Sequence, residues 1–206
     1  MTEIEREKRA AAEAAAELVE DGMTVGLGTG STVAFLLPAL AARRLRDLRC
    51  VATSVATEEL ARELGLPVEP FEQLDRLDIA IDGADQVTPD RWLVKGGGGA
   101  HTREKIVAAA ADRFVVIVSS DKLVDELRPP VPLELLAFGL PATLHAVRPV
   151  TVRAAELSPD GGVLADHMGE IGDPAALAAR LAGTPGVVEH GLFTPDLVSD
   201  VVLGRP

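Results

Sequence analysis

The stretch MTVGLGTGSTVAFLLPALAARRL, residues 23–45, decides the fold class. Its apolar run Met23 to Leu27 has the length of a short strand, and Gly28-Thr29-Gly30-Ser31-Thr32 has the composition of a tight turn. Val33 to Leu45 follows as a predicted helix. The stretch therefore predicts a strand, a glycine turn and a helix in succession, which is the repeating unit of α/β proteins.

The same alternation continues along the chain. An amphipathic helix is predicted at Thr2–Glu20, where apolar side chains recur at helical spacing among Glu, Lys and Arg. Short strands alternating with helices favour a doubly wound, mainly parallel sheet covered on both faces, and this α/β class is our prediction. The further elements are predicted at Cys50–Thr53, Thr57–Leu64, Asp78–Ile81, near Lys95 and at Phe114–Val118.

A second, smaller unit is predicted after Arg128-Pro129-Pro130-Val131-Pro132, because so many prolines cannot continue a helix. Short strands and two helices follow, which suits a small α+β sandwich. Leu197–Leu203 is predicted to return to the first sheet as a strand. The expected domains are residues 1–128 with 196–206, and residues 129–195. The strands are predicted from Leu133 and at Val150–Leu157, Val163–His167 and Val187–Phe193, and the helices around Thr143 and at Pro174–Leu181.

The composition disfavours several classes of partner. A net charge of -12 disfavours nucleic acid, because phosphate backbones are bound mainly by Lys and Arg. Cys50 is the only cysteine, and the chain starts with a charged, alanine-rich stretch instead of an apolar signal region. No apolar run approaches the length that crosses a membrane. We expect a cytoplasmic protein with neither a membrane nor a nucleic acid partner.

The glycine turn is the first candidate site, because parallel sheets bind ligands at the carboxyl ends of their strands. Its glycines let backbone N–H groups face an anion at a helix N-terminus, and Thr29, Ser31 and Thr32 add hydroxyl donors. This composition suits a phosphate monoester, and an ordinary turn capped by Ser31 or Thr32 explains it equally well. The turn matches neither the dinucleotide fingerprint nor the Walker loop, so we expect no nucleotide cofactor.

A second candidate loop, Asp82-Gly83-Ala84-Asp85, follows an apolar run and places two carboxylates beside a glycine. Such a pair suits acid–base work, and the alternative is a solvated turn or a helix cap. The four histidines lack the spacing of metal ligands, so we expect no bound metal and interpret each of them as a surface or structural residue. They are His101, His145, His167 and His190.

The most informative stretch begins with Lys95-Gly96-Gly97-Gly98-Gly99. Four successive glycines cost chain entropy, and close approach of a ligand to the backbone explains them better than a flexible linker. Lys95 can place a cation over a developing oxyanion, and Glu104, just inside the next predicted helix, can point a carboxylate into the same cleft. Lys122 is either a second cation for the ligand or a surface lysine.

Taken in order, these loops resemble the signature blocks of the ribose-5-phosphate isomerase A family, and the resemblance spans nearly the whole chain. It implies a Rossmann-like large domain, a small ferredoxin-like lid domain, and a homodimer or homotetramer. It also implies interconversion of ribose 5-phosphate and ribulose 5-phosphate without a cofactor. The blocks are Gly28–Thr32, Asp82–Asp85, Lys95–Gly98 and Thr102–Lys105.

The resemblance also implies residue roles. Glu104 would move a proton between C2 and C1 through an enediolate, and Asp82 and Asp85 would serve ring opening and hydroxyl binding. Lys95 and the backbone amides of the glycines that follow it, Gly96–Gly99, would stabilise the oxyanion. This segment is called the glycine loop below. The residues implied to hold the phosphate are Thr29, Gly30, Ser31 and Thr32, helped by Lys8 and Lys122.

Two other classes of function are compatible with the same fold. One is a related sugar-phosphate enzyme, such as an amino-sugar phosphate deaminase, or a CoA transferase. The other is a non-catalytic sugar-phosphate sensor, which needs the phosphate loop but not an acid–base set. The presence of Glu104, Asp82 and Lys95 together favours the isomerase.

Overall fold

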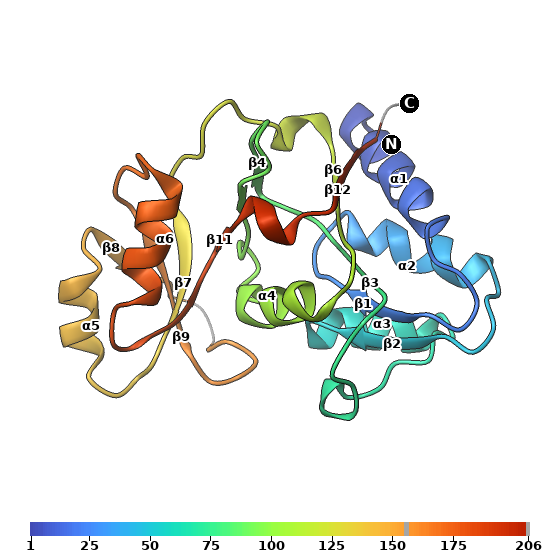
Figure 1. Ribbon diagram of the computed structural model, residues 1–206, viewed down its shortest axis with the longest axis horizontal. Helices are drawn as coiled ribbons and strands as arrows, with labels where there is room; N and C mark the ends of the chain where they lie inside the picture. Colours follow the sequence, from blue (N-terminus) through green and yellow to red (C-terminus); the bar gives the residue numbers. More distant parts are fainter. Residues whose placement is uncertain (155–156, 205–206) are drawn as a thin grey trace. The chain divides into compact units, whose positions relative to one another are not determined.

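The computed structural model describes residues 1–154 and 157–204. The chain divides into two compact units (Figure 1). The first contains Met1–Ala84, Arg103–Leu123 and the C-terminal residues from Asp196, and the second contains Asp85–Thr102 and Val124–Pro195. Residues 85–102 thus group with the second unit. The domain boundaries expected from the sequence stay a prediction, because compactness alone does not define an independently folding domain.

A five-stranded parallel sheet forms the centre of the first unit. Its inner strands are buried along most of their length, as expected for a parallel sheet covered on both faces. The doubly wound sheet is confirmed, and so is the return of the C-terminal strand. The strand order is β12-β6-β3-β1-β2, with β1 at Thr24–Leu27, β2 at Arg49–Ala52, β3 at Ile79–Asp82, β6 at Phe114–Val118 and β12 at Asp200–Leu203.

Helices cover both faces of this sheet. Val25 and Leu27 of β1 belong to the core that α1 and α2 also line. Side chains alternate along a strand, so Gly26 faces the other way, where a Cβ would overlap Val107 of α4. The helices are α1 (Glu3–Ala16), α2 (Val33–Ala42), α3 (Val55–Glu63) and α4 (His101–Ala110). A capping box at Thr2 starts α1, which ends before the predicted Glu20.

The second unit contains a four-stranded antiparallel sheet in the order β10-β7-β9-β8. Val131, Leu133 and Leu135 of β7 share a core with Leu177 and Leu181 of α6, which places that helix on one face of the sheet. The small α+β unit is confirmed. Its elements are β7 (Val131–Leu135), α5 (Leu140–Ala146), β8 (Val150–Val152), β9 (Val163–His167), α6 (Pro174–Ala182) and β10 (Val187–His190).

The strand predicted near Lys95 was assigned to the wrong sheet. β5 (Leu93–Val94) pairs antiparallel with β4 (Gln86–Val87) and β11 (Leu192–Phe193) in a three-stranded sheet of the second unit. The strand predicted at Val187–Phe193 is split at Gly191, where a Cβ would overlap the Lys95 carbonyl. An apolar run predicts a strand but does not identify its pairing partner.

Short 3-10 helices lie at Phe71–Gln73 (η1), Ser120–Lys122 (η2) and Pro195–Leu197 (η3). The strand predicted at Val150–Leu157 is confirmed at Val150–Val152, and its positions 155 and 156 lie outside the described residues. Within the described ranges, no helix has both the length and the apolar character needed to cross a membrane.

Candidate active site

The glycine turn between β1 and α2 is built around the Asp82 carboxylate. Asp82 is the last residue of β3 and is 3 % exposed, and its Oδ1 accepts from Thr29 N–H at 3.0 Å and from Gly83 N–H at 2.7 Å. Because β1 and β3 are parallel, their carboxyl ends lie at the same edge of the sheet. A Cβ on Gly28 would overlap the Asp82 side chain, so the turn requires glycine there. Asp82 is therefore held by backbone donors.

Two buried threonines support the turn from the neighbouring strand and helix. Thr57 in the first turn of α3 donates its hydroxyl to the Gly28 carbonyl at 2.8 Å. The Thr53 hydroxyl lies 2.8 Å from the Thr29 hydroxyl. Neither threonine belongs to the site residues predicted from the sequence. Thr53 directly follows β2, so its place at the end of a parallel strand was the available signal.

Lys8 of α1 reaches the same turn, where its Nζ donates to Ser31 Oγ at 2.8 Å. The preceding residue, Glu7, accepts from Ser120 N–H at 2.6 Å. This hydrogen bond connects α1 to η2, which carries Lys122. The predicted cations Lys8 and Lys122 thus come from two segments that are directly linked.

The pKa of Asp121 is affected by both of these lysines. Burial raises the pKa of Asp121, but the hydrogen bond from Ser119 and the charges of Lys122 and Lys8 lower it more, so its pKa lies below the usual value. Lys122 Nζ is 3.3 Å from the Asp121 carboxylate. Both lysines therefore act on one carboxylate, which indicates a local concentration of positive charge in an acidic chain.

Glu104 lies in the first turn of α4 and is 5 % exposed. A carboxylate is favoured in this position because the N-terminus of a helix carries partial positive charge. A nearly water-free setting also suits a base that must act on a carbon-bound proton. Glu104 is therefore the best candidate base in the first unit.

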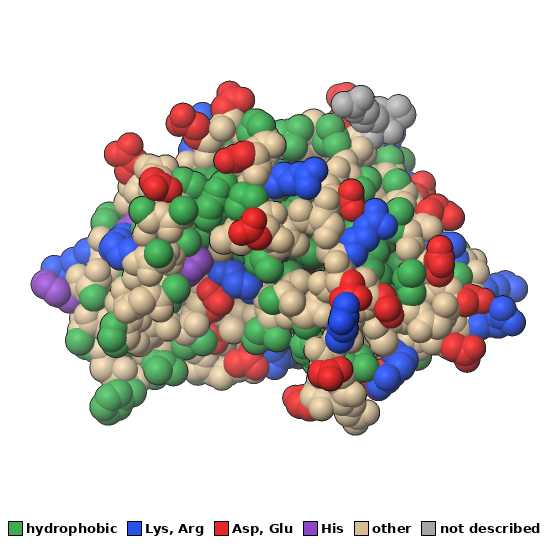
Figure 2. Space-filling model, viewed as in Figure 1, with side chains coloured by type: hydrophobic (Ala, Val, Ile, Leu, Met, Phe, Trp, Pro, Cys, Tyr) green, Lys and Arg blue, Asp and Glu red, His purple; other side chains and the backbone are tan. Residues whose placement is uncertain are grey.

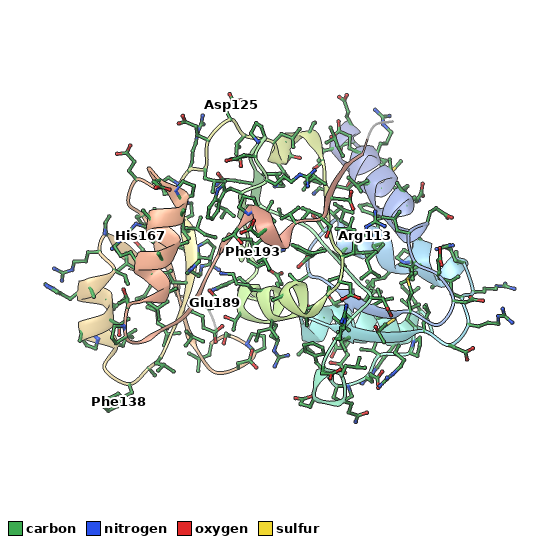
Figure 3. All side chains as sticks on the ribbon, in the orientation of Figure 1. Arg113, Asp125, Phe138, His167, Glu189 and Phe193 are labelled. Carbon is green, nitrogen blue, oxygen red and sulfur yellow. The ribbon has the colours of Figure 1, made fainter. Side chains whose placement is uncertain are left out.

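The second unit positions another carboxylate on the glycine loop. Asp85 Oδ2 accepts from Gly97 N–H at 2.8 Å. Lys95 is 3 % exposed, and its Nζ lies 5.6 Å from the centre of the Phe193 ring, which is labelled in Figure 3. Gly96 has a φ of +102°, and a Cβ there would overlap the buried His101 ring. The buried His101 ring therefore packs against the loop at Gly96.

The structure brings together Thr29, Asp82 and Gly83 in the first unit, and Asp85 and Gly97 in the second. Glu104 belongs to the first unit and Lys95 to the second. The remaining predicted residues differ in exposure: Gly30, Ser31 and Gly98 are exposed, Ala84, Lys8 and Lys122 are half-buried, and Gly96 is buried.

The structure bears on the helix cap and on the metal site that the sequence left as alternatives. Thr32 occupies the N-cap position of α2, but its side chain makes no capping hydrogen bond, so the cap does not explain the hydroxyl at this position. In residues 1–154 and 157–204, no group of three or more His, Cys, Asp or Glu side chains is arranged to hold a metal ion.

A parallel sheet with a glycine turn, a fixed carboxylate and nearby lysines at its carboxyl edge is typical of α/β enzymes that act on small phosphorylated metabolites. The family model of ribose 5-phosphate isomerase A (phosphoriboisomerase A) matches residues 49–206, and the chain belongs to this family. A second model, the DeoR C terminal sensor domain, matches residues 3–65.

Relatives and solved structures agree with the family match. The chain is 46 % identical to ribose-5-phosphate isomerase A of Caulobacter vibrioides over 96 % of this chain and 93 % of that protein. The ribose 5-phosphate isomerase A structure from Methanocaldococcus jannaschii has a TM-score of 0.90 at 34 % identity, covering 96 % of this chain and 94 % of that one. A D-ribose-5-phosphate isomerase in complex with phospho-erythronic acid has a TM-score of 0.92 at 34 % identity, covering 98 % and 96 %.

Proposed function

We propose that this chain interconverts ribose 5-phosphate and ribulose 5-phosphate, with Glu104 as the base that moves the proton. The observation that carries the proposal is the match to the isomerase family over residues 49–206, a range that contains Asp82, Lys95 and Glu104. The DeoR sensor model ends at residue 65, before all three of these residues.

The proposed reaction needs one base and a stabilised oxyanion. The Glu104 carboxylate takes the proton from C2 of the open-chain aldose, and the C1 carbonyl oxygen gains the negative charge of an enediolate. The proton returns to C1, and the hydroxyl proton of O2 moves to O1, which yields the ketose. Lys95 and the amides of Gly96, Gly97 and Gly98 would stabilise the negative charge on O1.

Asp82 and Asp85 are proposed to bind substrate hydroxyls and to assist ring opening. Each carboxylate already accepts from a backbone N–H, so each is oriented before a substrate arrives. Preorganised acceptors avoid the cost of ordering them in the transition state. Gly83 and Ala84 are proposed to line the same substrate site.

The phosphate is proposed to bind the glycine turn, with Thr29 to Thr32 as donors and with Lys8 and Lys122 as cations. The Lys8 contact with Ser31 and the charge environment of Asp121 support this assignment. Because the chain has a net charge of -12, attraction of an anion depends on such local cations.

Conversion of ribose 5-phosphate in the presence of EDTA tests the proposed reaction. We expect ribulose 5-phosphate to form, and we expect product made in D₂O to carry solvent deuterium, because an enediolate exchanges protons through the base. Binding without turnover would instead support a sensor. Failure to convert ribose 5-phosphate would contradict the proposed reaction.

We also propose that the chain forms a homodimer or homotetramer and works in the cytoplasm, as the family resemblance implies. Light scattering coupled to size-exclusion chromatography tests the assembly. A mass of one chain, 21.6 kDa, would contradict it.

A further inference from the structure

Arg153, which follows β8 in the second unit, connects the antiparallel sheet to the glycine loop. Its Nε and Nη2 donate to the two carboxylate oxygens of Asp166 on β9 at 2.8 and 2.6 Å. Its Nη1 donates to the carbonyls of Gly96 and Gly97 at 2.9 and 3.2 Å. Less than a fifth of either charged side chain is exposed, so water competes only weakly for this fork-shaped contact.

The glycine loop is a tight turn in which Gly99 N–H donates to the Gly96 carbonyl at 3.0 Å. Gly97 and Gly98 are its two central residues. Turns of types I and II differ mainly by rotation of the central peptide group, and glycine tolerates both. The local hydrogen bond therefore closes the turn without selecting the orientation of the Gly97–Gly98 peptide.

The contact with Arg153 supplies this selection. A trans peptide group points its carbonyl and its N–H in opposite directions. The Gly96 carbonyl faces Arg153 while the Gly97 N–H of the same peptide donates to Asp85 at 2.8 Å. By the same geometry, the Gly97 carbonyl on Arg153 turns Gly98 N–H away from the guanidinium.

The surroundings of Gly98 are open. A Cβ at this position would meet no heavy atom within 4 Å. Among the described residues, Gly98 N–H has no hydrogen-bond acceptor. A ligand oxygen can therefore approach this donor.

We propose that Arg153 is a positioning residue, which holds the Gly97–Gly98 peptide in one orientation and so presents Gly98 N–H to the substrate oxyanion. This inference rests on the proposed function, in which the glycine amides stabilise that oxyanion. Asp166 serves the same purpose indirectly, because it fixes the plane of the guanidinium. The cation on two carbonyls also polarises the attached N–H groups and strengthens them as donors.

Steady-state kinetics of Arg153→Met on ribose 5-phosphate test the proposal. We expect kcat to fall at least about tenfold while KM changes less than about threefold, because the loss is confined to transition-state stabilisation. Arg153→Lys should recover part of kcat, since a lysine is a single point donor without the fork. Asp166→Asn should lower kcat less, in the same direction.

Arg113→Met is the matched control, because Arg113 (labelled in Figure 3) pairs with Asp200 through Nε at 2.9 Å in the first unit. The Arg113→Met variant should have the kcat of the wild type. Folded Arg153→Met with wild-type kcat would overturn the proposal, and so would a loss of thermal stability with an unchanged kcat. If Arg153→Met does not fold, wild-type kcat in both Arg153→Lys and Asp166→Asn would overturn it.

Hydrogen exchange separates this inference from the proposed function. The Gly97 and Gly98 amides should exchange faster in Arg153→Met than in Arg113→Met, whatever the substrate is. An inactive wild-type protein with this exchange difference would contradict the isomerase but keep the positioning role. Equal exchange in the two variants would contradict the positioning role alone.

Discussion

The position of the Asp82 carboxylate requires a glycine at residue 28. Two backbone N–H groups donate to it, and Gly28 leaves the space in which it lies. The motif Gly28 to Thr32 is therefore more than a flexible turn, because its first glycine makes room for a carboxylate from another strand.

Gly28→Ala tests this close approach. The added methyl group overlaps Asp82, so we expect the free energy of unfolding to fall by about 1–3 kcal/mol, as for other overpacked sites, with loss of turnover. Urea denaturation measures the change. Gly83→Ala is the stability control, because its Cβ would lie 3.8 Å from the Ile117 carbonyl oxygen, an ordinary contact. Equal stability of Gly28→Ala and the wild type would contradict the packing argument.

Asp78 predicts a pH dependence of stability. Its carboxylate accepts from Thr24 N–H at 2.7 Å and from the Thr24 hydroxyl at 2.8 Å, and these bonds lower its pKa from 3.8. A lowered pKa stabilises the folded state above the unfolded pKa, and this contribution is lost as the pH falls through the folded pKa.

Asp78→Asn should therefore destabilise the protein at about pH 7, and the difference from the wild type should shrink toward about pH 2. Urea titrations at several pH values measure it. Asp75→Asn, on an exposed carboxylate, serves as the control. A difference that is constant over the whole pH range would rule out this linkage.

The helices and strands that were predicted correctly are marked by signals in their own sequence. The strand, glycine turn and helix at residues 23–45 are local, and the Pro174 helix is marked by Asp173, whose side chain accepts from Ala175 N–H at 2.9 Å. The wrong assignment concerned β5, which pairs with the nearby β4 as a short antiparallel hairpin and with the distant β11, because an apolar run encodes neither partner.

Asp173→Ala tests the cap of α6. We expect a loss of about 1 kcal/mol in the free energy of unfolding, because two N–H groups of the first turn lose their acceptor. Asp173→Asn retains an acceptor and should cost less. Chemical denaturation followed by circular dichroism measures both, and identical stabilities of the two variants would argue against the capping role.

For the chain as a whole, the sequence suggested candidate site residues where a short motif indicates a specific chemistry, and their roles stay predictions. Asp82, Glu104 and Lys95 stood in short blocks beside predicted strands and helices. Thr57, Arg153 and Asp166 did not, because their hydrogen bonds depend on which groups the tertiary fold places beside them.

The distribution of charge, like these contacts, depends on the tertiary fold. The net charge of -12 describes the average, and the face in Figure 2 shows acidic and basic side chains interspersed. The two lysines that are proposed to bind the phosphate, Lys8 and Lys122, both lower the pKa of Asp121. Composition alone predicts repulsion of polyanions, whereas the proposed binding of one small anion depends on where the fold places individual lysines.

The kinetics of Glu104→Gln test the central claim most directly. Glutamine keeps the shape of the buried side chain and removes its ability to accept a proton. We predict that kcat for ribose 5-phosphate falls at least about a hundredfold with little change in KM, the usual worth of a positioned base. Glu63→Gln, on an exposed carboxylate of α3, should leave kcat unchanged. Near-normal turnover in Glu104→Gln would contradict the account.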